Sequence, residues 1–437
     1  MKCLNLILII FLFPLFGFSQ FEVSTFAGNG SPGRDNGMGQ KAQFNSPFGI
    51  TKDSKGNLFV ADGGNNLIRK ITPAGDVSIF AGTGAAGSLD SSALNSTFNS
   101  STGVAFDKFG NLFVADFLNH KIRKIDTSGK VTTVAGTGIA GFKDTISTQA
   151  QFNYPRGVVV DSKGNIYVGD SWNHRIRKID PLGNVTTFAG GGENRGVQSV
   201  GDYVDGKADS ARFYTPSGLA IDGNDNIYVA DPFNHRIRKI DTTQNVSTVV
   251  GSGPTGQNNG SQDNGHVSQA TLHTPTEVCL DGKGNIYIGD TFNSLVRKLS
   301  NDSVSTIAGS VQGYSDGEAN KARFSYTRGV VTTSNGDSLY VVDFNNHAIR
   351  LISEKQTSTN LSPVTPETFS FYPNPTRDGI FLNGLNLDLN EIKISTVFGK
   401  IVAPPIIEEN GYIRLNSLSK GIYILTINGV SKKLIKN

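Results

Sequence analysis

Six segments of similar sequence follow one another through most of the chain, and this repetition constrains the fold more than any other feature. Each segment contains a short apolar run that ends in aspartate, and these aspartates lie 53 to 61 residues apart, at Asp62, Asp116, Asp170, Asp231, Asp290 and Asp343. A repeat of this length indicates a solenoid, a propeller or another array in which each unit packs against its neighbours. The chain therefore contains one supersecondary unit, repeated with loops of variable length.

The third unit shows what this repeated element is. Its runs GVVVD, NIYVGD, HRIRKID and VTTFAG are rich in β-branched and aromatic residues and are separated by glycine, asparagine and aspartate. Such runs predict four short strands, and four strands per unit are typical of a propeller blade. Glycine takes 51 of the 437 positions against 16 for proline, which agrees with β structure rich in turns.

The repeats also predict how the ring closes. Six sets of three strands are followed by only five fourth-strand sequences, which end at Gly82, Gly136, Gly190, Gly251 and Gly309. The missing fourth strand stands near the start of the chain, in the sequence FEVSTFAGNG from Phe21 to Gly30. We therefore predict an all-β, six-bladed β-propeller over residues 20–353 that is closed by its N-terminal strand, an arrangement that leaves no open edge in the ring.

Residues 1–19 differ in composition from the repeats. Lys2 precedes an apolar run from Leu6 to Phe16, which predicts a signal peptide and a mature chain that begins at Gln20. The run is too short for a membrane span and Pro14 interrupts it, so no transmembrane segment is expected in the mature chain.

The C-terminal part of the chain departs from the repeat as well. Residues 354–367 are polar with two prolines, which is the composition of a linker. Residues 368–437 again alternate strand-like runs with turns, and this pattern predicts a small C-terminal β-sandwich.

Both parts resemble known families. The motifs Pro-x-Gly-Val/Ile, Gly-Asn-Leu/Ile-Tyr/Phe-Val-Ala-Asp and Asn-His-x-Ile-Arg-Lys-Ile, over residues 21–353, resemble the NHL repeat family of six-bladed propellers. Residues 368–437 resemble the type A C-terminal sorting domain of the type IX secretion system of Bacteroidetes, on a motif of Tyr372, Pro373, Asn374, Pro375, Gly399, Gly421 and Tyr423. This second resemblance implies the type IX secretion machinery as a partner, passage through the periplasm, and delivery to the outer-membrane surface or the medium.

Candidate binding residues lie where the first strand of each unit begins. The position before the repeated glycine should ring the mouth of the central channel in all six blades, at Phe48, Thr102, Arg156, Ser217, Thr276 and Arg328. Arg156 and Arg328 stand three blades apart and should face each other across the axis. In the fifth unit Glu277 replaces the repeated glycine, so a carboxyl group joins the two arginines.

Two interpretations of these three residues stay open. The guanidiniums of Arg156 and Arg328 could bracket an anionic ligand such as a uronate, another carboxylate or a phosphate. Alternatively, Glu277 pairs with one of the arginines, or both arginines point into solvent.

Other recurring polar residues are assigned to the scaffold. The aspartate that ends each second strand and the arginine seven residues later could meet across the hairpin, and a pair present six times does not mark one active site. His120, His174, His235 and His347 share one repeat position, too far apart for a common metal ion, which favours packing or loop hydrogen bonds. A further set of aspartates is expected to cap short helical turns, at Asp35, Asp90, Asp144, Asp205, Asp263 and Asp316.

These features favour a secreted or cell-surface binding module over an enzyme, with a protein, a glycan or a small anionic molecule as ligand. The sequence contains no nucleophile elbow, phosphate-binding loop or metal motif, so no cofactor is assigned. The alternative is a propeller enzyme at the same channel mouth, because the propellers that this chain resembles include lyases and lactonases. RNA binding, known for some intracellular NHL domains, is disfavoured by the export signals and by a net charge of only +3.

Overall fold

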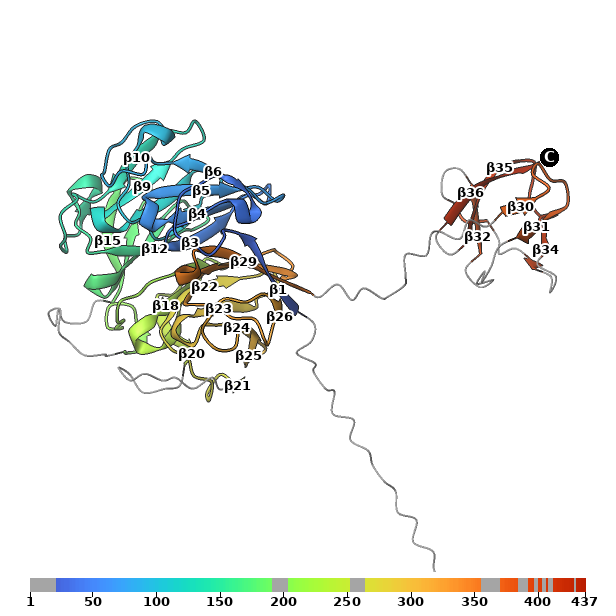
Figure 1. Ribbon diagram of the computed structural model, residues 1–437. Helices are drawn as coiled ribbons and strands as arrows, with labels where there is room; N and C mark the ends of the chain where they lie inside the picture. The colour runs from blue at the N-terminus through green and yellow to red at the C-terminus, as the bar shows by residue number, and fades with distance from the viewer. Residues whose placement is uncertain are drawn as a thin grey trace, which may run out of the picture. The chain divides into compact units, whose positions relative to one another are not determined.

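The computed structural model describes residues 21–190, 203–251, 264–354, 370–383, 392–396, 400–402, 406–407, 412–427 and 430–437. The chain divides into two compact units, Met1–Lys355 and Gln356–Asn437. The first unit consists of six antiparallel sheets, which confirms the all-β, six-bladed propeller (Figure 1). The predicted signal peptide, residues 355–367 of the predicted linker, and Gly399 lie outside the described residues.

Each blade contains four strands in the order predicted from the repeat, and the first strands of neighbouring blades contact one another around the channel. The strands of blades 1 to 3 are β3 (Pro47–Lys52), β4 (Leu58–Asp62), β5 (Leu67–Ile71) and β6 (Asp76–Ala81); β7 (Val104–Phe106), β8 (Leu112–Asp116), β9 (Lys121–Ile125) and β10 (Val131–Ala135); and β12 (Pro155–Val160), β13 (Ile166–Asp170), β14 (Arg175–Ile179) and β15 (Asn184–Ala189). Those of blades 4 to 6 are β17 (Leu219–Ile221), β18 (Ile227–Asp231), β19 (Arg236–Ile240) and β20 (Asn245–Val250); β22 (Pro275–Leu280), β23 (Ile286–Asp290), β24 (Leu295–Ser300) and β25 (Ser303–Ala308); and β27 (Thr327–Thr332), β28 (Ser338–Asp343), β29 (Ala348–Glu354) and β1 (Phe21–Ala27).

A short fifth strand on the outer edge of five blades was not predicted. These strands are β2 (Gly37–Met38), β11 (Thr145–Ile146), β16 (Gly206–Lys207), β21 (Gly265–His266) and β26 (Gly317–Glu318). Blade 2 has a single bridge between Ser92 and Lys130 instead. Two residues are too short to show any periodicity, so pairing with the fourth strand creates these elements, and this pairing covers part of an otherwise open edge.

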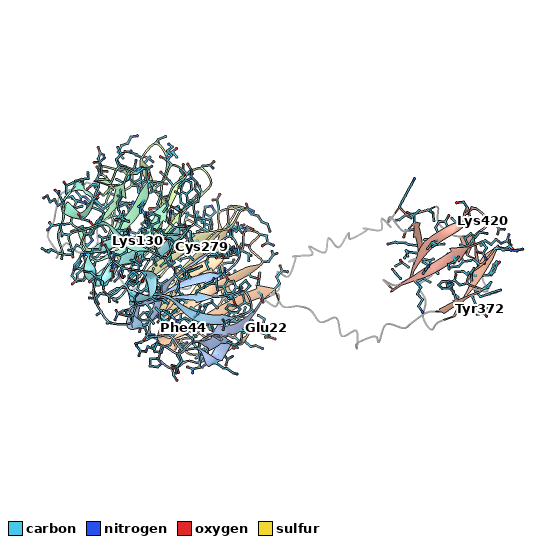
Figure 2. The ribbon with its side chains drawn as sticks, turned by 90° about the horizontal axis from the view of Figure 1, so that it is seen from above. Glu22, Phe44, Lys130, Cys279, Tyr372 and Lys420 are labelled. Carbon is cyan, nitrogen blue, oxygen red and sulfur yellow. The ribbon has the colours of Figure 1, made fainter. Side chains whose placement is uncertain are left out.

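The N-terminal strand closes the ring, as predicted. β1 pairs with β29, where Val23 lies opposite Ile352, and it pairs on its other side with β26 (Figure 1). Val23 is buried in the interface between blades 5 and 6, whereas Ala27 is buried between blades 6 and 1. In Figure 2 Glu22 of β1 marks the periphery of the propeller, while Cys279 of β22 lies toward its middle.

The hydrophobic core of the propeller consists of six clusters, one between each pair of neighbouring blades. The cluster between blades 2 and 3, for example, joins Phe113 and Ile122 to Val158 and Ile166. Because every blade contributes one face to each of two clusters, no blade buries its apolar surface alone, and the ring depends on all six units.

The C-terminal unit has two sheets. One contains β30 (Ser370–Tyr372), β31 (Gly379–Asn383), β34 (Tyr412–Arg414) and β33 (Ile406–Ile407), and the other contains β32 (Lys393–Thr396), β35 (Gly421–Ile427) and β36 (Val430–Lys436). Ile380 and Ile413 of the first sheet share one core with Ile394 and Leu425 of the second, which confirms the small β-sandwich. Within the described residues of the whole chain, no helix has the length and hydropathy that a membrane span requires.

The first prediction concerns ring closure. Deleting Phe21–Ala27 from the mature chain removes the ladder to β29 and two buried apolar side chains, and it opens the edge of blade 6. We expect a loss of several kcal/mol of stability, which lowers the Tm by about 10 °C or more. Calorimetry measures this, with a deletion of equal length at 356–362 in the predicted linker as the control. Equal Tm values for the two deletion variants would contradict the closure role of β1.

Candidate functional site

The candidate site lies at the end of the propeller where the first strand of each blade begins, which we call the mouth face. In blade 3, Pro155 at the start of β12 pairs with Asp170 at the end of β13. The turns that join the second and third strands are therefore on the mouth face as well. They are the 3-10 helices η3 (Gly63–Asn65), η5 (Phe117–Asn119), η7 (Ser171–Asn173), η8 (Pro232–Asn234), η9 (Thr291–Asn293) and η10 (Phe344–Asn346).

Arg156 and Arg328 come together over one aromatic ring at the mouth. The guanidinium carbon of Arg328 lies 4.3 Å from the centre of the Phe48 ring, and that of Arg156 lies 5.7 Å from the same centre. Arg156 also lies over Phe117 at 5.4 Å, and Arg328 over Phe344 at 4.2 Å. Both side chains thus rest on aromatic faces, as guanidinium groups do when their charge is only partly solvated.

Neither mouth arginine has a hydrogen-bond or ion-pair partner among the described residues, and the Nε atom of each is buried. Burial lowers the pKa of Arg156 to about 10. It lowers the pKa of Arg328 to about 9, to which the positive charge of Arg156 contributes. Both groups are still protonated at neutral pH, so the mouth carries two positive charges that the described residues do not neutralise.

Three other positions of the expected ring do not line the mouth. Thr102, Ser217 and Thr276 are buried. The Thr102 hydroxyl donates to the backbone oxygen of Arg156 in the next blade, and the Thr276 hydroxyl lies 2.6 Å from that of Thr291. The small side chains at this position are therefore buried, whereas the large ones, Phe48, Arg156 and Arg328, are partly exposed at the opening.

Glu277 lies one residue deeper, in a cavity of about 140 Å³ inside the channel. The cavity wall is formed by the first strands and includes Gly49, Gly103, Gly157 and Cys279. The repeated glycines pack so closely between blades that a Cβ atom on Gly157 would lie 2.2 Å from the backbone oxygen of Ser217. In blade 5 the Glu277 side chain occupies the space that a side chain on Gly218 would need.

Glu277 makes no ion pair with either mouth arginine. Its Oε1 atom accepts a hydrogen bond from the N–H of Val278 at 3.4 Å, and no other polar partner is described. Burial raises the pKa of this carboxyl group to about 8, so Glu277 is largely protonated at neutral pH. It therefore does not offset the charge of Arg156 and Arg328 under these conditions.

The recurring aspartate and arginine of the blades meet as expected. In blade 1 Arg69 binds Asp62 at 3.0 Å, and corresponding pairs in the other blades span 2.6 to 3.1 Å. All twelve side chains are fully buried. Burial raises the pKa of Asp62 to about 6, whereas hydrogen bonds from Asn45, Asn65 and Arg69 act in the opposite direction, so the carboxylate is ionised at neutral pH. These pairs support the blades, and their full burial keeps them out of reach of a ligand at the surface.

The expectation that a second set of aspartates caps helical turns was wrong. Asp90 accepts hydrogen bonds from Arg123 and from the N–H of Thr133. Asp144, Asp205 and Asp316 bind the buried arginines of their own blades in the same way. In blade 1 the neighbouring Asn36 takes this role rather than Asp35, and in blade 5 Asn264 takes it. Asp263 lies outside the described residues. The buried arginine needs a second acceptor, and this requirement outweighs the local capping preference.

The four recurring histidines form hydrogen bonds, one of the two roles expected for them, and these bonds join neighbouring blades. Each ends a 3-10 helix in the left-handed conformation, and its Nδ1 atom accepts a backbone N–H of the following blade at 3.0 to 3.1 Å; the donors are Tyr154 for His120, Thr215 for His174, Thr274 for His235 and Ser46 for His347. In blade 1 Asn66 does the same with its Oδ1 atom, at 2.9 Å from the N–H of Ser100. No group of three or more histidine, cysteine, aspartate or glutamate side chains within the described ranges is arranged to hold a metal ion.

Aromatic side chains on the mouth face are the residues that sequence reasoning missed. Trp172, Phe233 and Phe292 hold the same place in η7, η8 and η9, and their side chains are 44%, 46% and 47% exposed. Because strand-forming repeats are rich in aromatic residues, the residue type alone does not show that these three lie outside the core. The available signal was variation, since the same place holds Gly64 in blade 1 and Asn345 in blade 6.

In the sorting-domain motif, the structure describes all residues except Gly399. Asn374 joins the ends of the unit, because its side chain donates to the backbone oxygen of Lys433 and accepts from the N–H of Ile435. Tyr423 is buried and its hydroxyl donates to the backbone oxygen of Ser419, while Tyr372 is exposed. Gly421 begins the strand β35.

Comparison with family models finds matches in both units. The NHL repeat model matches residues 152–179, a teneurin NHL domain model matches residues 198–311, and a secretion system C-terminal sorting domain model matches residues 370–437.

Curated relatives match part of this chain and are longer than it. The chain is 30% identical over 250 residues to the chloroplastic protein SUPPRESSOR OF QUENCHING 1 of Arabidopsis thaliana, over 53% of this chain and 23% of the relative. It is 28% identical over 375 residues to NHL repeat-containing protein 2 of Homo sapiens, over 76% of this chain and 51% of the relative. The matched part thus spans about a quarter to a half of these two relatives.

Solved structures share the fold at low sequence identity. An auxiliary nutrient binding protein of Bacteroides ovatus is 17% identical, with a TM-score of 0.57, over 77% of this chain and 78% of that protein. A second auxiliary nutrient binding protein, from Bacteroides thetaiotaomicron, is 16% identical, with a TM-score of 0.58 and 77% of each chain covered.

The second prediction concerns the histidine bonds. Burial lowers the pKa of His120, His174 and His347, so the fold favours their neutral form. In the unfolded chain these histidines become protonated near pH 6.5. The contribution of the neutral histidines to stability is therefore complete above that pH and decreases as the pH falls below it. Replacing the three histidines by Asn, which serves at the same place in blade 1, keeps the acceptor and removes the titration. We expect the Tm of the variant to fall less than that of the wild type between pH 6.5 and 5.

Thermal melts of both proteins from pH 8 to 5 measure this difference. Because every other titrating group is shared, the difference between the two curves isolates the three imidazoles. Parallel curves over the whole range would contradict the assignment of these hydrogen bonds as pH-sensitive.

Proposed function

Because this chain consists of an NHL-repeat propeller followed by a secretion system C-terminal sorting domain, we propose that it is an exported binding protein that takes an anionic ligand at the mouth of its channel. The observation that carries the proposal is the pair Arg156 and Arg328, whose guanidiniums lie over Phe48 without a hydrogen-bond or ion-pair partner among the described residues. A ligand carboxylate or phosphate would supply the missing acceptors.

The energetics of the two arginines support this role. A partly desolvated charge without a partner destabilises a fold, and the lowered pKa values of Arg156 and Arg328 express that loss. The buried arginines of the six blades, by contrast, each have a carboxylate. Residues that lower stability without serving the fold are characteristic of functional sites.

The geometry favours a small, planar anion or the anionic group of a larger molecule. Guanidinium groups bind carboxylate and phosphate oxygens through paired N–H donors, and two of them at one opening can hold one such group from both sides. Phe48, Phe117 and Phe344 provide apolar surface beside these charges. Glu277 stays largely neutral at pH 7, which leaves the opening positive.

The structural relatives support binding rather than a particular ligand. Two proteins of the same fold are auxiliary nutrient binding proteins of Bacteroides species, which agrees with a binding role. The sorting domain supports export, which for the type IX route means delivery to the surface or the medium. In this scheme residues 1–19 are the signal peptide, 20–353 the propeller, 354–367 the linker and 368–437 the sorting domain.

The third prediction tests the arginine pair. Replacing Arg156 and Arg328 by Ala should reduce affinity for an anionic ligand by more than tenfold, since each charge-assisted contact contributes about 1.5 to 3 kcal/mol. Stability should be unchanged or higher, because the substitution removes two partly buried charges that lack partners. Calorimetric titration with glucuronate, citrate and phosphate, together with thermal melts, measures both effects.

Lys163→Ala is the matched control, since this lysine is exposed at the far end of blade 3. Unchanged affinity of the double variant for every anion that the wild type binds would place the ligand elsewhere. Metal-dependent turnover of a lactone or peptide substrate by the wild type would show that the site is enzymatic.

The fourth prediction concerns export. A chain truncated after Thr365 lacks the sorting domain but keeps every blade, so its propeller should fold with an unchanged Tm and accumulate in the periplasm. Cell fractionation of a type IX-competent host, probed with an antibody against the propeller, locates the protein. Delivery of the truncated chain to the surface or medium at the wild-type level would overturn the sorting assignment.

A further inference from the structure

Three clusters of aromatic rings extend over the mouth face from blade 2 to blade 6. Phe117, Tyr154 and Trp172 form the first, with ring centres 4.9 and 4.7 Å apart. His174, Tyr214 and Phe233 form the second, at 5.3 and 5.1 Å. His235, His273, Phe292 and Tyr326 form the third, at 5.6, 5.2 and 5.2 Å. We call these ten residues the aromatic arc.

The arc reaches the arginine pair at both ends. Phe117 of the first cluster lies beneath Arg156, and Tyr326 of the third stands two residues before Arg328 in the chain. A ligand that follows the arc can therefore meet a positive charge without leaving the aromatic surface.

The scaffold does not require these rings. Blade 1 has the same backbone at the corresponding places with Ser46, Gly63 and Gly64, and the ring is complete without aromatic residues there. Exposure of Trp172, Phe233 and Phe292 is unfavourable for a protein that must stay soluble, and aromatic surface grouped in this way indicates a binding face.

Polar donors accompany the rings. The Nδ1 atoms of His120 and His174 accept backbone hydrogen bonds, so in their neutral form these imidazoles carry a proton on Nε2. Those Nε2 atoms have no partner among the described residues, and the His120 ring stands edge-on to Tyr154 while the His174 ring stands edge-on to Tyr214. The face thus offers flat apolar surfaces with neutral donors between them.

This combination matches a sugar chain better than a nucleic acid. A pyranose ring has a face of C–H groups that can pack on the negative face of an aromatic ring, and a rim of hydroxyls that needs neutral donors and acceptors. A single-stranded nucleic acid brings one phosphate for every stacked base and needs positive charges along its whole path. Lys121, Arg175 and Arg236 begin the third strands of blades 2 to 4 at the mouth end. Arg175 and Arg236 are buried over Phe142 and Tyr203, so they do not line an exposed path of positive charge along the arc.

We infer that the aromatic arc and the mouth arginines together bind a linear polysaccharide that contains uronic acid, with sugar rings on the arc and a uronate carboxylate at Arg156 and Arg328. The inference rests on the proposed function and specifies its ligand class. It assigns the neutral part of the recognition to Trp172, Phe233 and Phe292 and the charged part to the arginines.

The fifth prediction is tested by titrating the purified full chain with polygalacturonate, hyaluronan and alginate, and with methyl-esterified polygalacturonate, which has the same backbone without the charges. The triple variant Trp172→Ala, Phe233→Ala and Phe292→Ala should bind the preferred acidic polymer at least tenfold more weakly than the wild type does. If that polymer is polygalacturonate, the triple variant should also bind its methyl ester at least tenfold more weakly. The Arg156→Ala and Arg328→Ala variant should lose affinity only for the acidic form. Trp172→Phe, with the other two rings intact, should retain most of the affinity.

Phe109→Ala is the control, because this phenylalanine is 70% exposed in the turn at the opposite end of blade 2. It should change neither binding nor Tm, and the Tm of the triple variant should also be unchanged. The inference is overturned by equal affinity of the triple variant and the wild type, by binding of none of the three acidic polymers, or by arc-dependent binding of a thymidine oligonucleotide or a protein in their place. A different result would contradict the proposed function itself, namely that the arginine variant binds glucuronate and the acidic polymer with the same affinity as the wild type.

Discussion

The propeller depends on a buried ion pair that occurs once in every blade. In blade 1 the guanidinium of Arg69 binds the carboxylate of Asp62, donates to backbone oxygens of Gln43 and Asp35 and to Asn36, and lies 5.1 Å from the centre of the Phe44 ring. Removing either partner from such a pair leaves an uncompensated buried charge, which destabilises a protein by about 3 to 5 kcal/mol. Because the same atoms bind the entry loop, the second strand and the third strand, the pair determines the shape of each blade as well as its stability.

This scaffold explains where the molecule can vary. Asp62 and Arg69 recur in every blade because their ion pair holds its strands together, and the closely packed glycine recurs in all blades except blade 5. The positions at the mouth are not needed for this packing, and they differ from blade to blade. Arg156 and Arg328 have the same chemistry as the buried arginines but lack their carboxylates, and Glu277 has a carboxyl group but no cation within ion-pair distance among the described residues. Departure from the repeat, and not the repeat itself, therefore marks the candidate site.

The same contrast separates the two kinds of aromatic residue. Phe44, Phe98 and Phe152 are fully buried against the guanidiniums of their blades, and every unit needs a large apolar side chain there. Trp172, Phe233 and Phe292 occupy turns whose backbone also forms with glycine or asparagine. The first group stabilises the ring, and the second is available for contact with a ligand.

The sequence by itself determined the number of blades, the order of strands and the closure by Phe21–Ala27, because the same local pattern occurs six times and each copy supports the others. It also determined the small second β unit, whose strand-like runs alternate with turns. It also predicted the Asp–Arg pairs, which follow from position within one unit, and it assigned the recurring histidines to packing or loop hydrogen bonds. Only the tertiary structure decided the fifth strands, the second acceptor of each buried arginine, the approach of Arg156 and Arg328 over Phe48, the isolation of Glu277 and the aromatic arc. Each of these features depends on atoms from different blades or from distant loops. The spacing of residues along one repeat does not specify how the side chains of the neighbouring blade or loop are placed against it.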